Sequence, residues 1–417
     1  MSIVLAHPLT ESAQLGLAPA FVGLLAGVLA VGGARLLAVG GARLLVATGR
    51  PAEPAPSGIA GSEGTAGTPA TLSPLEWVGR ALGVGLLLLA IAAGRLGSPA
   101  QFDNIAPALV IGVGWPLLLV ASAALGGVWD RMNPFDTLSR GVQRIAGATT
   151  ANPHDRLWTG SLLGALGWTW WLGAYIPQGL EPRAIGLALG LYTVVILAGC
   201  VTFGREAWLS EGEVFTLTFR AIARARSAAG DPVPVRHLST LAVLIGGLFY
   251  AELRFSRWYL SELERFGIDR FADSTVLIGY VVTVGLAVAA VHGAHRWAAR
   301  HRVQGAVRAL LPWLVVGLGL SAALERDRLW VSAQLLVVRA SDPLGAGWDL
   351  FGTAGRGVVT WPYGDVTRLW LQVAALGVTT LVGLALAMRR VEGGRTEPLI
   401  VLGGGWLVLA VLSAASL

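Results

Sequence analysis

The sequence predicts an all-α polytopic membrane protein, a transmembrane helical bundle of about ten spans, and two observations lead to this prediction. Hydrophobic residues make up 54% of the 417 residues and charged residues only 13%, whereas roughly 25% of the residues in a typical globular domain are charged. The hydrophobic residues also gather in runs of roughly 18 to 25, the length that crosses a hydrocarbon layer of roughly 30 Å at about 1.5 Å per residue. Lipid is therefore the expected solvent for most side chains.

The apolar runs and the arginines together predict a topology. The runs cover residues 15–33, 77–94, 105–128, 158–177, 184–203, 237–255, 274–297, 306–325, 367–388 and 397–415. An even number of spans places both termini on the same side of the membrane. Cytoplasmic loops keep an excess of positive charge, and most arginines fall in alternate loops, among them Arg140, Arg144, Arg220 and Arg224. These loops are expected in the cytoplasm of a bacterium, with both termini outside its plasma membrane.

Three segments follow one another along the chain. Residues 1–48 hold the first span and a cytoplasmic extension, and the absence of positive charge before this span argues against a removable signal peptide. Residues 49–73 are rich in Pro, Gly, Ala and Ser, which predicts a flexible cytoplasmic linker. The main bundle, residues 74–417, begins where Ser73, Pro74 and Glu76 supply an N-cap serine, a proline at the first helical position and a glutamate at the third.

Two cytoplasmic loops are predicted to contain amphipathic helices. In the first loop Asn133 is expected to cap a helix that Pro134 opens, and in the second loop Ser210 and Glu213 are expected to form a capping box. Each helix carries apolar residues at helical spacing opposite several arginines. Both are therefore predicted to lie in the membrane interface, with arginines reaching anionic headgroups.

The region before the last two spans leaves alternatives open. Residues 326–366 form a long outer loop, and the apolar stretch 329–339 within it is open to a re-entrant path. Acids and aromatic residues in this loop fit either a lid over a pocket or a membrane-interface belt, and the belt is favoured. Within the spans themselves charged residues are nearly absent, which argues against proton-driven transport. Trp115 and Pro116 predict a local break in the third span, either a packed kink or an opened binding site.

A few titratable residues are candidates for chemistry. On the cytoplasmic side His292 and His295 share one helix face, and His237 is expected at a similar depth, which suggests a metal or proton-handling site. The candidate acid or base residues are Glu206, Glu211 and Glu213 beside these histidines, and Asp103 on the outer side. The competing interpretation, which we favour, is that these side chains simply populate a headgroup boundary rich in arginine. No cofactor is predicted, and a divalent metal is left open.

The single cysteine and the basic charge exclude other classes of protein. Cys200 falls inside an apolar run, so neither an intrachain disulfide nor a thiolate metal cluster is available. The net charge of +6 comes entirely from arginines between apolar runs, a pattern that favours contact with anionic lipid headgroups over nucleic-acid binding.

Four segments keep their order from about residue 100 to the C-terminus and carry a family likeness. They are NIAPALVIGVGWPLLLVASAALGGVWDRMNPFDTLSR, GREAWLSEGEVFTLTF, SDPLGAGWDLFGT and RLWLQVAALGVTTLVGLALA. Together they resemble a family of polytopic membrane proteins from high-GC bacteria labelled fenitrothion hydrolase-like. The resemblance implies hydrolysis of an organophosphate triester, and it supplies no set of catalytic residues to carry over.

Three functions are therefore compatible with the sequence. The first is a membrane-embedded binding or complex-assembly protein, which has the lipid bilayer and other membrane subunits as partners. The second is a transporter or facilitator for a small solute. The third is a membrane-bound hydrolase, as the family resemblance implies.

Overall fold

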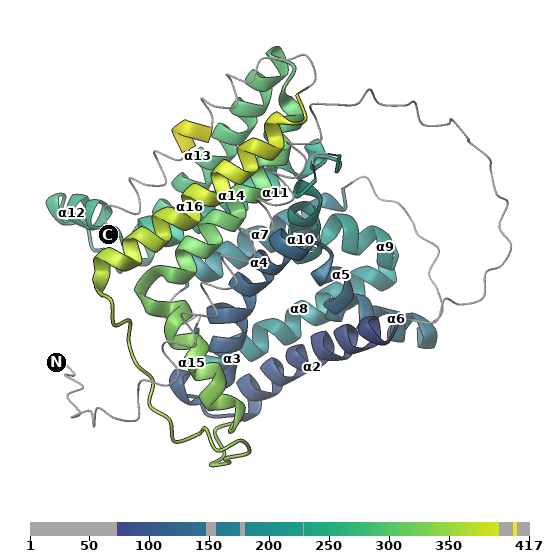
Figure 1. Cartoon of the computed structure of the whole chain (residues 1–417), viewed down its shortest axis with the longest axis vertical. Helices are drawn as coiled ribbons and strands as arrows, with labels where there is room; N and C mark the ends of the chain where they lie inside the picture. The colour runs from purple at the N-terminus through teal and green to yellow at the C-terminus, as the bar shows by residue number, and fades with distance from the viewer. Residues whose placement is uncertain (1–72, 147–155, 176–179, 228, 392–402, 407–417) are drawn as a thin grey trace, which may run out of the picture. The chain divides into compact units, whose positions relative to one another are not determined.

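A computed structural model describes residues 73–146, 156–175, 180–227, 229–391 and 403–406, and every regular element in these ranges is a helix (Figure 1). The all-α fold class is confirmed. The chain divides into two compact units, Met1–Ala81 and Leu82–Leu417, and of the first unit only residues 73–81 are described. The predicted segment 1–48 and the predicted linker, apart from Ser73, lie outside the described residues.

The helices fall into long and short classes. The long ones are α2 (Pro74–Leu96), α4 (Trp115–Leu125), α6 (Pro134–Ala146), α7 (Trp158–Gly173), α8 (Pro182–Phe203), α10 (Val214–Ala225), α11 (Leu238–Leu253), α12 (Arg257–Arg265), α13 (Asp273–Arg300), α14 (Gln304–Leu324), α15 (Arg328–Ala340) and α16 (Gly364–Met388). The short ones are η1 (Gln101–Asp103), α3 (Ile105–Pro107), η2 (Ala108–Gly114), α5 (Val128–Met132), α9 (Arg205–Ala207), η4 (Trp208–Gly212), η5 (Val235–His237) and η6 (Glu325–Asp327).

Six helical segments of the described chain are long and apolar enough to cross a membrane. They are Pro74–Leu96, Ile105–Leu125, Pro182–Phe203, Asp273–Arg300, Gln304–Leu324 and Gly364–Met388. A seventh candidate consists of Val235–Leu253 and Arg257–Arg265, which are bent by 71° at the break between them. The chain is therefore a polytopic helical membrane protein with six or seven candidate spans among the described residues.

The remaining predicted spans are not among these candidates, for two separate reasons. The runs 15–33 and 397–415 lie outside the described residues, except for a short helix at residues 403–406. The run 158–177 corresponds to α7, which has 16 residues and is therefore about 24 Å long, less than the roughly 30 Å of a hydrocarbon layer.

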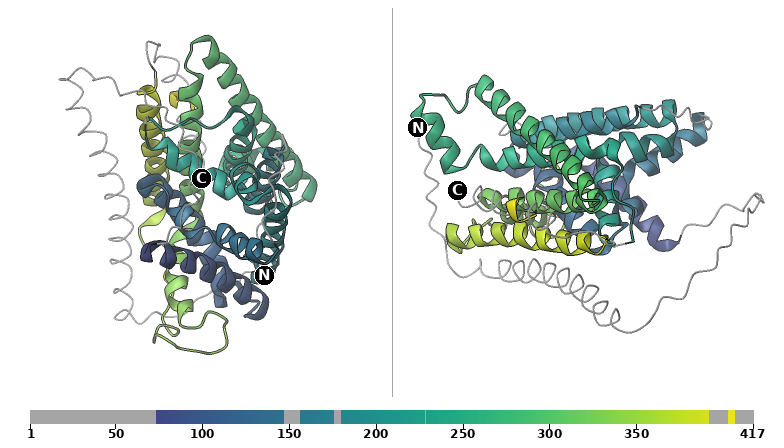
Figure 2. Two further views of the ribbon diagram at one scale, coloured as in Figure 1. Left: turned by 90° about the vertical axis from the view of Figure 1, so that its right-hand side faces the viewer. Right: turned by 90° about the horizontal axis from the view of Figure 1, so that it is seen from above.

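Helix α14 is the centre of the larger unit. Almost all of its residues are buried, because α4, α10, α11, α13 and α16 pack around it. Helices α14 and α16 run side by side (Figure 2), and Gly383 permits their close approach. A Cβ atom at Gly383 would lie 2.8 Å from Cδ1 of Leu310 and from Cβ of Trp313.

The third span is broken before Trp115, as the sequence predicts. Its segment η2 is a π-helix, and α4 begins at Trp115. Pro116 cannot donate a backbone hydrogen bond, which favours this irregular turn. The 13-residue helix α15 packs against η2, and it is too short, at about 20 Å, to cross a membrane. A Cβ atom at Gly112 would lie 2.0 Å from Oγ of Ser332, so glycine is required where α15 approaches.

Two of the three predicted helix caps are confirmed. At the start of α2 the backbone N–H of Ser73 donates to Oε2 of Glu76 at 2.9 Å, and the backbone N–H of Glu76 donates to Oγ of Ser73 at 3.3 Å. At the start of α6 the side-chain oxygen of Asn133 accepts hydrogen bonds from the backbone N–H groups of Phe135 and Asp136.

The predicted capping box of Ser210 and Glu213 is wrong. Ser210 lies within η4 and donates its hydroxyl to the carbonyl oxygen of Ala207 at 3.2 Å. Glu213 is itself the N-cap of α10, and its carboxylate accepts the backbone N–H groups of Phe215 at 2.9 Å and Thr216 at 2.6 Å. The π-helical turn η4 occupies the residues that were expected to open α10, so α10 begins later.

The two predicted interfacial helices are both present as helices, and α10 is more deeply buried than an interfacial helix. Phe219 and Ile222 of α10 are each 1% exposed, since α4, α7 and α14 cover this helix. Helix α6 packs against α8. An amphipathic pattern can face a protein core as well as a lipid surface, which is why the sequence alone could not separate these cases.

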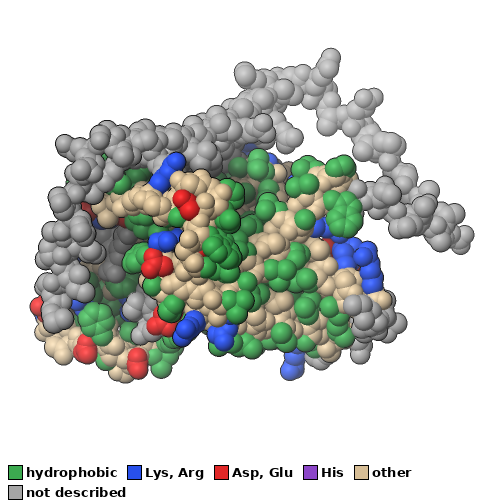
Figure 3. All heavy atoms as spheres, turned by 90° about the horizontal axis from the view of Figure 1, so that it is seen from below, with side chains coloured by type: hydrophobic (Ala, Val, Ile, Leu, Met, Phe, Trp, Pro, Cys, Tyr) green, Lys and Arg blue, Asp and Glu red, His purple; other side chains and the backbone are tan. Residues whose placement is uncertain are grey.

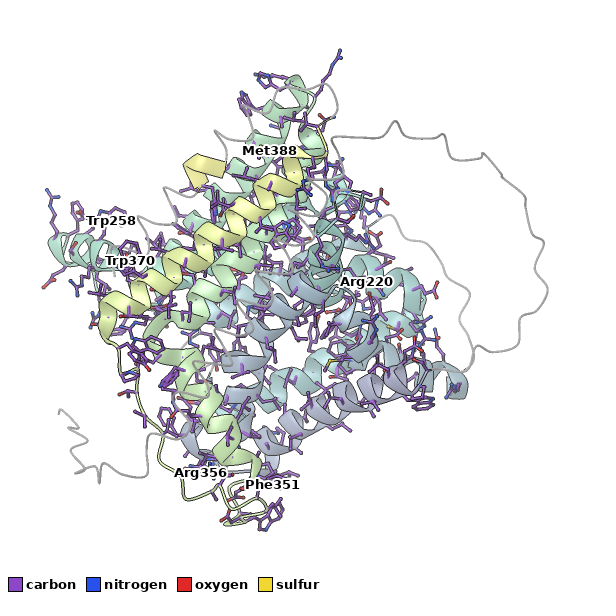
Figure 4. All side chains as sticks on the ribbon, in the orientation of Figure 1. Arg220, Trp258, Phe351, Arg356, Trp370 and Met388 are labelled. Atoms are coloured by element: carbon purple, nitrogen blue, oxygen red, sulfur yellow. The ribbon has the colours of Figure 1, made fainter. Side chains whose placement is uncertain are left out.

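Polar loops gather at two ends of the larger unit. At one end the ion pairs Arg205–Asp136 and Arg220–Asp130 join helices that are far apart in the sequence. At the other end Arg339 pairs with Asp103 and Arg368 with Asp327. Figure 4 shows Arg220 and Met388 toward the first end and Trp258, Trp370, Phe351 and Arg356 toward the second.

Candidate ligand-binding cavity

Helices α7 and α8 are consecutive in the chain, and their main packing partners differ. Helix α7 packs mainly against α11 and α8 mainly against α6, and both helices also contact η4. A cavity of about 450 Å³ lies between α7 and α8, with η2, η4 and the start of α10 completing its wall. Its lining is almost wholly apolar and includes Leu163, Trp168, Trp171, Val195, Trp208 and Phe215. Leu163 and Val195 are 67% and 56% exposed, so the cavity opens at the surface of the helices.

Three glycines of α7 shape this cavity. Gly160, Gly164 and Gly167 are spaced by four and three residues and therefore share one helix face. A Cβ atom at Gly160 would lie 2.8 Å from the carbonyl oxygen of Gly212, and one at Gly164 would lie 2.9 Å from Cγ1 of Val214. A Cβ atom at Gly167 would meet no atom within 4 Å. The first two glycines thus allow close packing, and the third leaves open volume.

A cluster of aromatic rings contributes Trp168, Tyr192 and Phe215 to one wall of the cavity. Its members, which we call the aromatic cluster, are Trp115, Trp129, Phe135, Trp168, Tyr192, Phe215 and Phe219. The ring centroids of Trp168 and Phe215 are 5.2 Å apart, and those of Trp115 and Trp168 are 5.3 Å apart, both in edge-to-face geometry. Such pairs contribute about 0.5–1.5 kcal/mol beyond burial, which makes this wall rigid.

A second cavity of about 270 Å³ lies beside the first. The two cavities share the lining residues Val110, Trp168, Leu189 and Phe215. The second also reaches Gly83 of α2 and Leu336 of α15. The shared residues therefore form a thin partition between two apolar volumes.

One buried polar pair adjoins the first cavity. Tyr192 lines the cavity and donates its hydroxyl to Oε1 of Glu213, and Glu213 is 0% exposed. Burial raises the pKa of the Glu213 carboxyl above its ordinary value, and hydrogen bonds from Thr216 and Tyr192 act in the opposite direction. Glu213, a candidate acid or base in the sequence, thus reaches the cavity only through Tyr192.

The other candidate acids lie in ion pairs. Glu211 accepts from Nε of Arg236 at 2.6 Å and lies 2.8 Å from Nε2 of the buried His237. The hydrogen bond from Arg236 lowers the pKa of Glu211 below its ordinary value. The side chain of Glu206 is 87% exposed and pairs with Arg205.

The last candidate acid, Asp103, lies at the opposite end of the larger unit. It pairs with Arg339 at 2.6 Å.

The three candidate histidines have different surroundings. Nε2 of His292 lies 3.0 Å from Oγ of Ser239, a serine at the start of α11. His295 follows one turn later on α13, and His237 pairs with Glu211. Within the described ranges no group of three or more His, Cys, Asp or Glu side chains is placed to hold a metal ion.

The predicted outer loop 326–366 contains α15, and two acids of the segment between α15 and α16 fold that segment upon itself. Asp342 accepts the backbone N–H groups of Ala346 and Gly347 at 2.8 Å each, and Asp349 accepts that of Ala354 at 3.0 Å. Backbone hydrogen bonds, first that of Ala354, lower the pKa of Asp349. These hydrogen bonds stabilise the turns of this segment.

The cavity itself was not predicted from the sequence. The glycine spacing in GALGWTWWLGAY was the available signal, because small residues on one helix face beside large aromatic residues leave volume next to a rigid wall. The partners that border this volume come from η2, α8, η4 and α10, which no local pattern brings together.

Comparison with known proteins gives no match. No protein-family model, no curated protein and no solved structure matches the chain. The fold alone defines the class, a polytopic helical membrane protein in contact with lipid. Figure 3 shows hydrophobic side chains spread over the middle of one face, and exposed residues such as Leu187, Leu191 and Val194 of α8 give the spans a lipid-facing surface.

Proposed function

We propose that this integral membrane protein binds an uncharged apolar or amphiphilic ligand, such as a neutral acyl lipid, in the cavity between α7 and α8. The observation that carries the proposal is the apolar cavity of about 450 Å³ between two consecutive helices that are held apart. Its volume falls within the range of roughly 300–1,000 Å³ that is usual for ligand sites. Charged ligands are disfavoured, because the lining residues include no ionisable side chain other than Tyr192.

Shape would select the ligand. An apolar molecule that moves from lipid into the cavity gains little hydrophobic free energy, because lipid tails are already apolar. Binding then depends on van der Waals contact with the rigid aromatic cluster and on the space beside Gly167. The exposed Leu163 and Val195 give the ligand a route from the bilayer without passage through water.

A photolabelling experiment tests the proposal. The probe is a neutral monoacylglycerol with a diazirine in its acyl chain, added to the full chain in phosphatidylcholine nanodiscs. Gly167→Leu should fill the cavity without a backbone clash, and Gly190→Leu is the matched control, since a Cβ atom there also meets nothing within 4 Å and Gly190 does not line the cavity. We expect label on α7 and α8 lining peptides in wild type and Gly190→Leu, and at least about a tenfold loss in Gly167→Leu. Equal labelling in all three proteins would overturn the proposal.

A transporter is the second function that we propose, and the paired cavities support it. The two volumes meet at the partition of Val110, Trp168, Leu189 and Phe215. A rotation of Trp168 would join them into a longer path. Flux of a small uncharged solute into proteoliposomes should then fall in Gly167→Leu and remain in Gly190→Leu, whereas absence of flux above empty liposomes removes this function.

Hydrolysis is the third function that we propose, and it rests on a different observation. Oγ of Ser239 and Nε2 of His292 lie 3.0 Å apart. A serine beside a histidine is the arrangement that activates a nucleophile. Triester hydrolysis by purified protein should be abolished by both Ser239→Ala and His292→Ala, and metal analysis of wild type and of a His292→Ala, His295→Ala variant would reveal a metal-dependent route. Full activity in the two single variants would exclude these residues.

We also propose the full topology of ten spans with both termini outside the plasma membrane of a bacterium. Ion pairs that join alternate inter-span segments at each end of the larger unit support the alternation of spans. Assembly with other membrane subunits remains part of the first proposed function. A pull-down from mild detergent tests it, and recovery of the chain alone would count against it.

A further inference from the structure

We propose that a small cavity at the bend between α11 and α12 binds a phosphate group, either of a phospholipid headgroup or of free phosphate. The cavity has a volume of about 200 Å³ and lies far along the chain from the aromatic cluster. Its lining includes Tyr250, Arg254, Tyr259, Arg270, Phe271 and Thr275. The proposal stands independently of the ligand in the larger cavity.

The bend creates the cavity. Helix α11 ends at Leu253, and α12 starts at Arg257 with Ser256 as its cap, which accepts the backbone N–H of Tyr259 at 3.2 Å. The 71° angle between the two helices turns α12 away from the bundle. The start of α13 then returns beside α11, and Thr275 in its first turn lines the cavity.

Two guanidinium groups from separate segments line this one volume. Arg254 is 9% exposed, and its Nη1 donates to the carbonyl oxygens of Gly173 at 2.5 Å and Ala174 at 3.2 Å, which hold the side chain in place. Arg270 lies with its guanidinium carbon 4.7 Å from the ring centroid of Phe271. No acidic residue lines the cavity. A phosphate in this volume can accept charge-assisted hydrogen bonds from arginine side chains.

The remaining walls also suit an oxyanion. Helix α13 has 28 residues, and its N-cap, Ala272, provides no side-chain acceptor for the first backbone N–H groups. Asp273 also lies in the first turn of α13 and partly offsets the positive end of the helix dipole, so the arginines supply most of the positive charge at the cavity. A Cβ atom at Gly279 would lie 2.6 Å from the hydroxyl of Tyr259 and 3.0 Å from that of Tyr250, so glycine leaves room for both hydroxyls at the cavity wall.

The surroundings indicate a membrane surface. Trp258, Phe266 and Phe271 are 57%, 69% and 69% exposed around this bend, and Figure 4 shows Trp258 on α12 projecting from the bundle. Exposed aromatic residues beside arginines are typical of the headgroup layer. A phosphate at this depth belongs to a phospholipid, and free phosphate shares the same chemistry.

Thermal unfolding of the full chain in neutral detergent distinguishes the sources. The probes are dioctanoyl phosphatidylglycerol, dioctanoylglycerol as the phosphate-free analogue, and inorganic phosphate. We expect the phospholipid to raise the melting temperature in a saturable manner and dioctanoylglycerol to have no such effect. Stabilisation by inorganic phosphate alone at similar concentration would assign the site to free phosphate, and the proposal of a phosphate site would stand.

Matched charge removals test the location. Arg270→Gln removes one lining guanidinium, whereas Arg265→Gln removes an arginine of α12 whose side chain is 72% exposed and does not line the cavity. Arg270→Gln should weaken half-saturation at least about tenfold, in line with the loss of one charge-assisted contact, and Arg265→Gln should change it less than about twofold. Gly279→Ala, which displaces the tyrosine hydroxyls, should weaken binding without a change in charge. Equal effects of the two arginine variants, or no stabilisation by either phosphate probe, would overturn the inference.

Discussion

At the scale of single residues, the hydrogen-bond partners of a polar side chain determine where it lies in this chain. Glu213 shows this most clearly, because its carboxylate accepts two backbone N–H groups of α10 and the hydroxyl of Tyr192 while it is 0% exposed. Ser210, which the sequence pattern pairs with it, faces the opposite direction along η4. The cap of α10 and the wall of the larger cavity therefore depend on the same carboxylate.

We expect Glu213→Ala to destabilise the protein by at least about 2 kcal/mol, because it leaves several buried donors without an acceptor. Ser210→Ala should change the free energy of unfolding by less than about 0.5 kcal/mol, since it removes only a hydroxyl-to-carbonyl contact. Thermal unfolding can be followed through the exposure of the buried thiol of Cys200 to a thiol-reactive dye. A larger loss in Ser210→Ala than in Glu213→Ala would contradict the assignment of the cap.

A pH series should reveal how much the Glu211 carboxylate contributes to stability. The hydrogen bond from Arg236 lowers the pKa of Glu211 in the folded chain, so the stabilisation that this carboxylate provides is present above its ordinary pKa and is lost as the pH falls through the lowered value. Wild type should therefore exceed Glu211→Gln in melting temperature at pH 7, and the difference should shrink below about pH 4.3. A difference in melting temperature that grows as the pH falls would contradict the lowered pKa of Glu211.

Elements are the scale at which the sequence was most informative. Apolar runs of spanning length predicted α2, α8, α13, α14 and α16 as helices, and Pro116 marked the break in the third span. The local pattern could not show that α10 would be buried, that α15 would pack on η2, or that α7 and α8 would be held apart. Those outcomes depend on partners far along the chain, such as Tyr192 for Glu213 and Ser332 for Gly112. The candidate site was missed for the same reason, since its lining comes from five elements.

Helix α16 provides an internal comparison for packing at the centre. A Cβ atom at Gly383 would lie 2.8 Å from atoms of Leu310 and Trp313, whereas one at Gly377 would meet nothing within 4 Å. Gly383→Ala should therefore lower the melting temperature through a clash that costs about 1–3 kcal/mol. Gly377→Ala should leave it unchanged or raise it, because alanine favours the helix by up to about 1 kcal/mol. Equal effects in a thermal unfolding assay would mean that α14 and α16 do not pack closely there.

At the largest scale, the larger unit has two polar ends. Loops that alternate along the chain meet at the same end, as the Arg205–Asp136 and Arg339–Asp103 pairs show at opposite ends. An accessible position at each end would therefore report the orientation of the candidate spans that connect the two ends. The arginine-rich end is the one expected in the cytoplasm.

Cysteine labelling decides this orientation with little background, because the one native cysteine, Cys200, is buried. Arg356→Cys places a thiol on an exposed position at the end where Trp258 and Phe351 lie, and Arg300→Cys places one at the exposed C-terminal end of α13. In intact cells a membrane-impermeant maleimide should label Arg356→Cys and leave Arg300→Cys unlabelled until the membrane is permeabilised. A cytoplasm-dependent reporter fused after Leu417 should be silent, because the predicted span 397–415 returns the chain to the outside. The reverse labelling pattern would invert the topology, and an active reporter with the expected labelling would remove that last span.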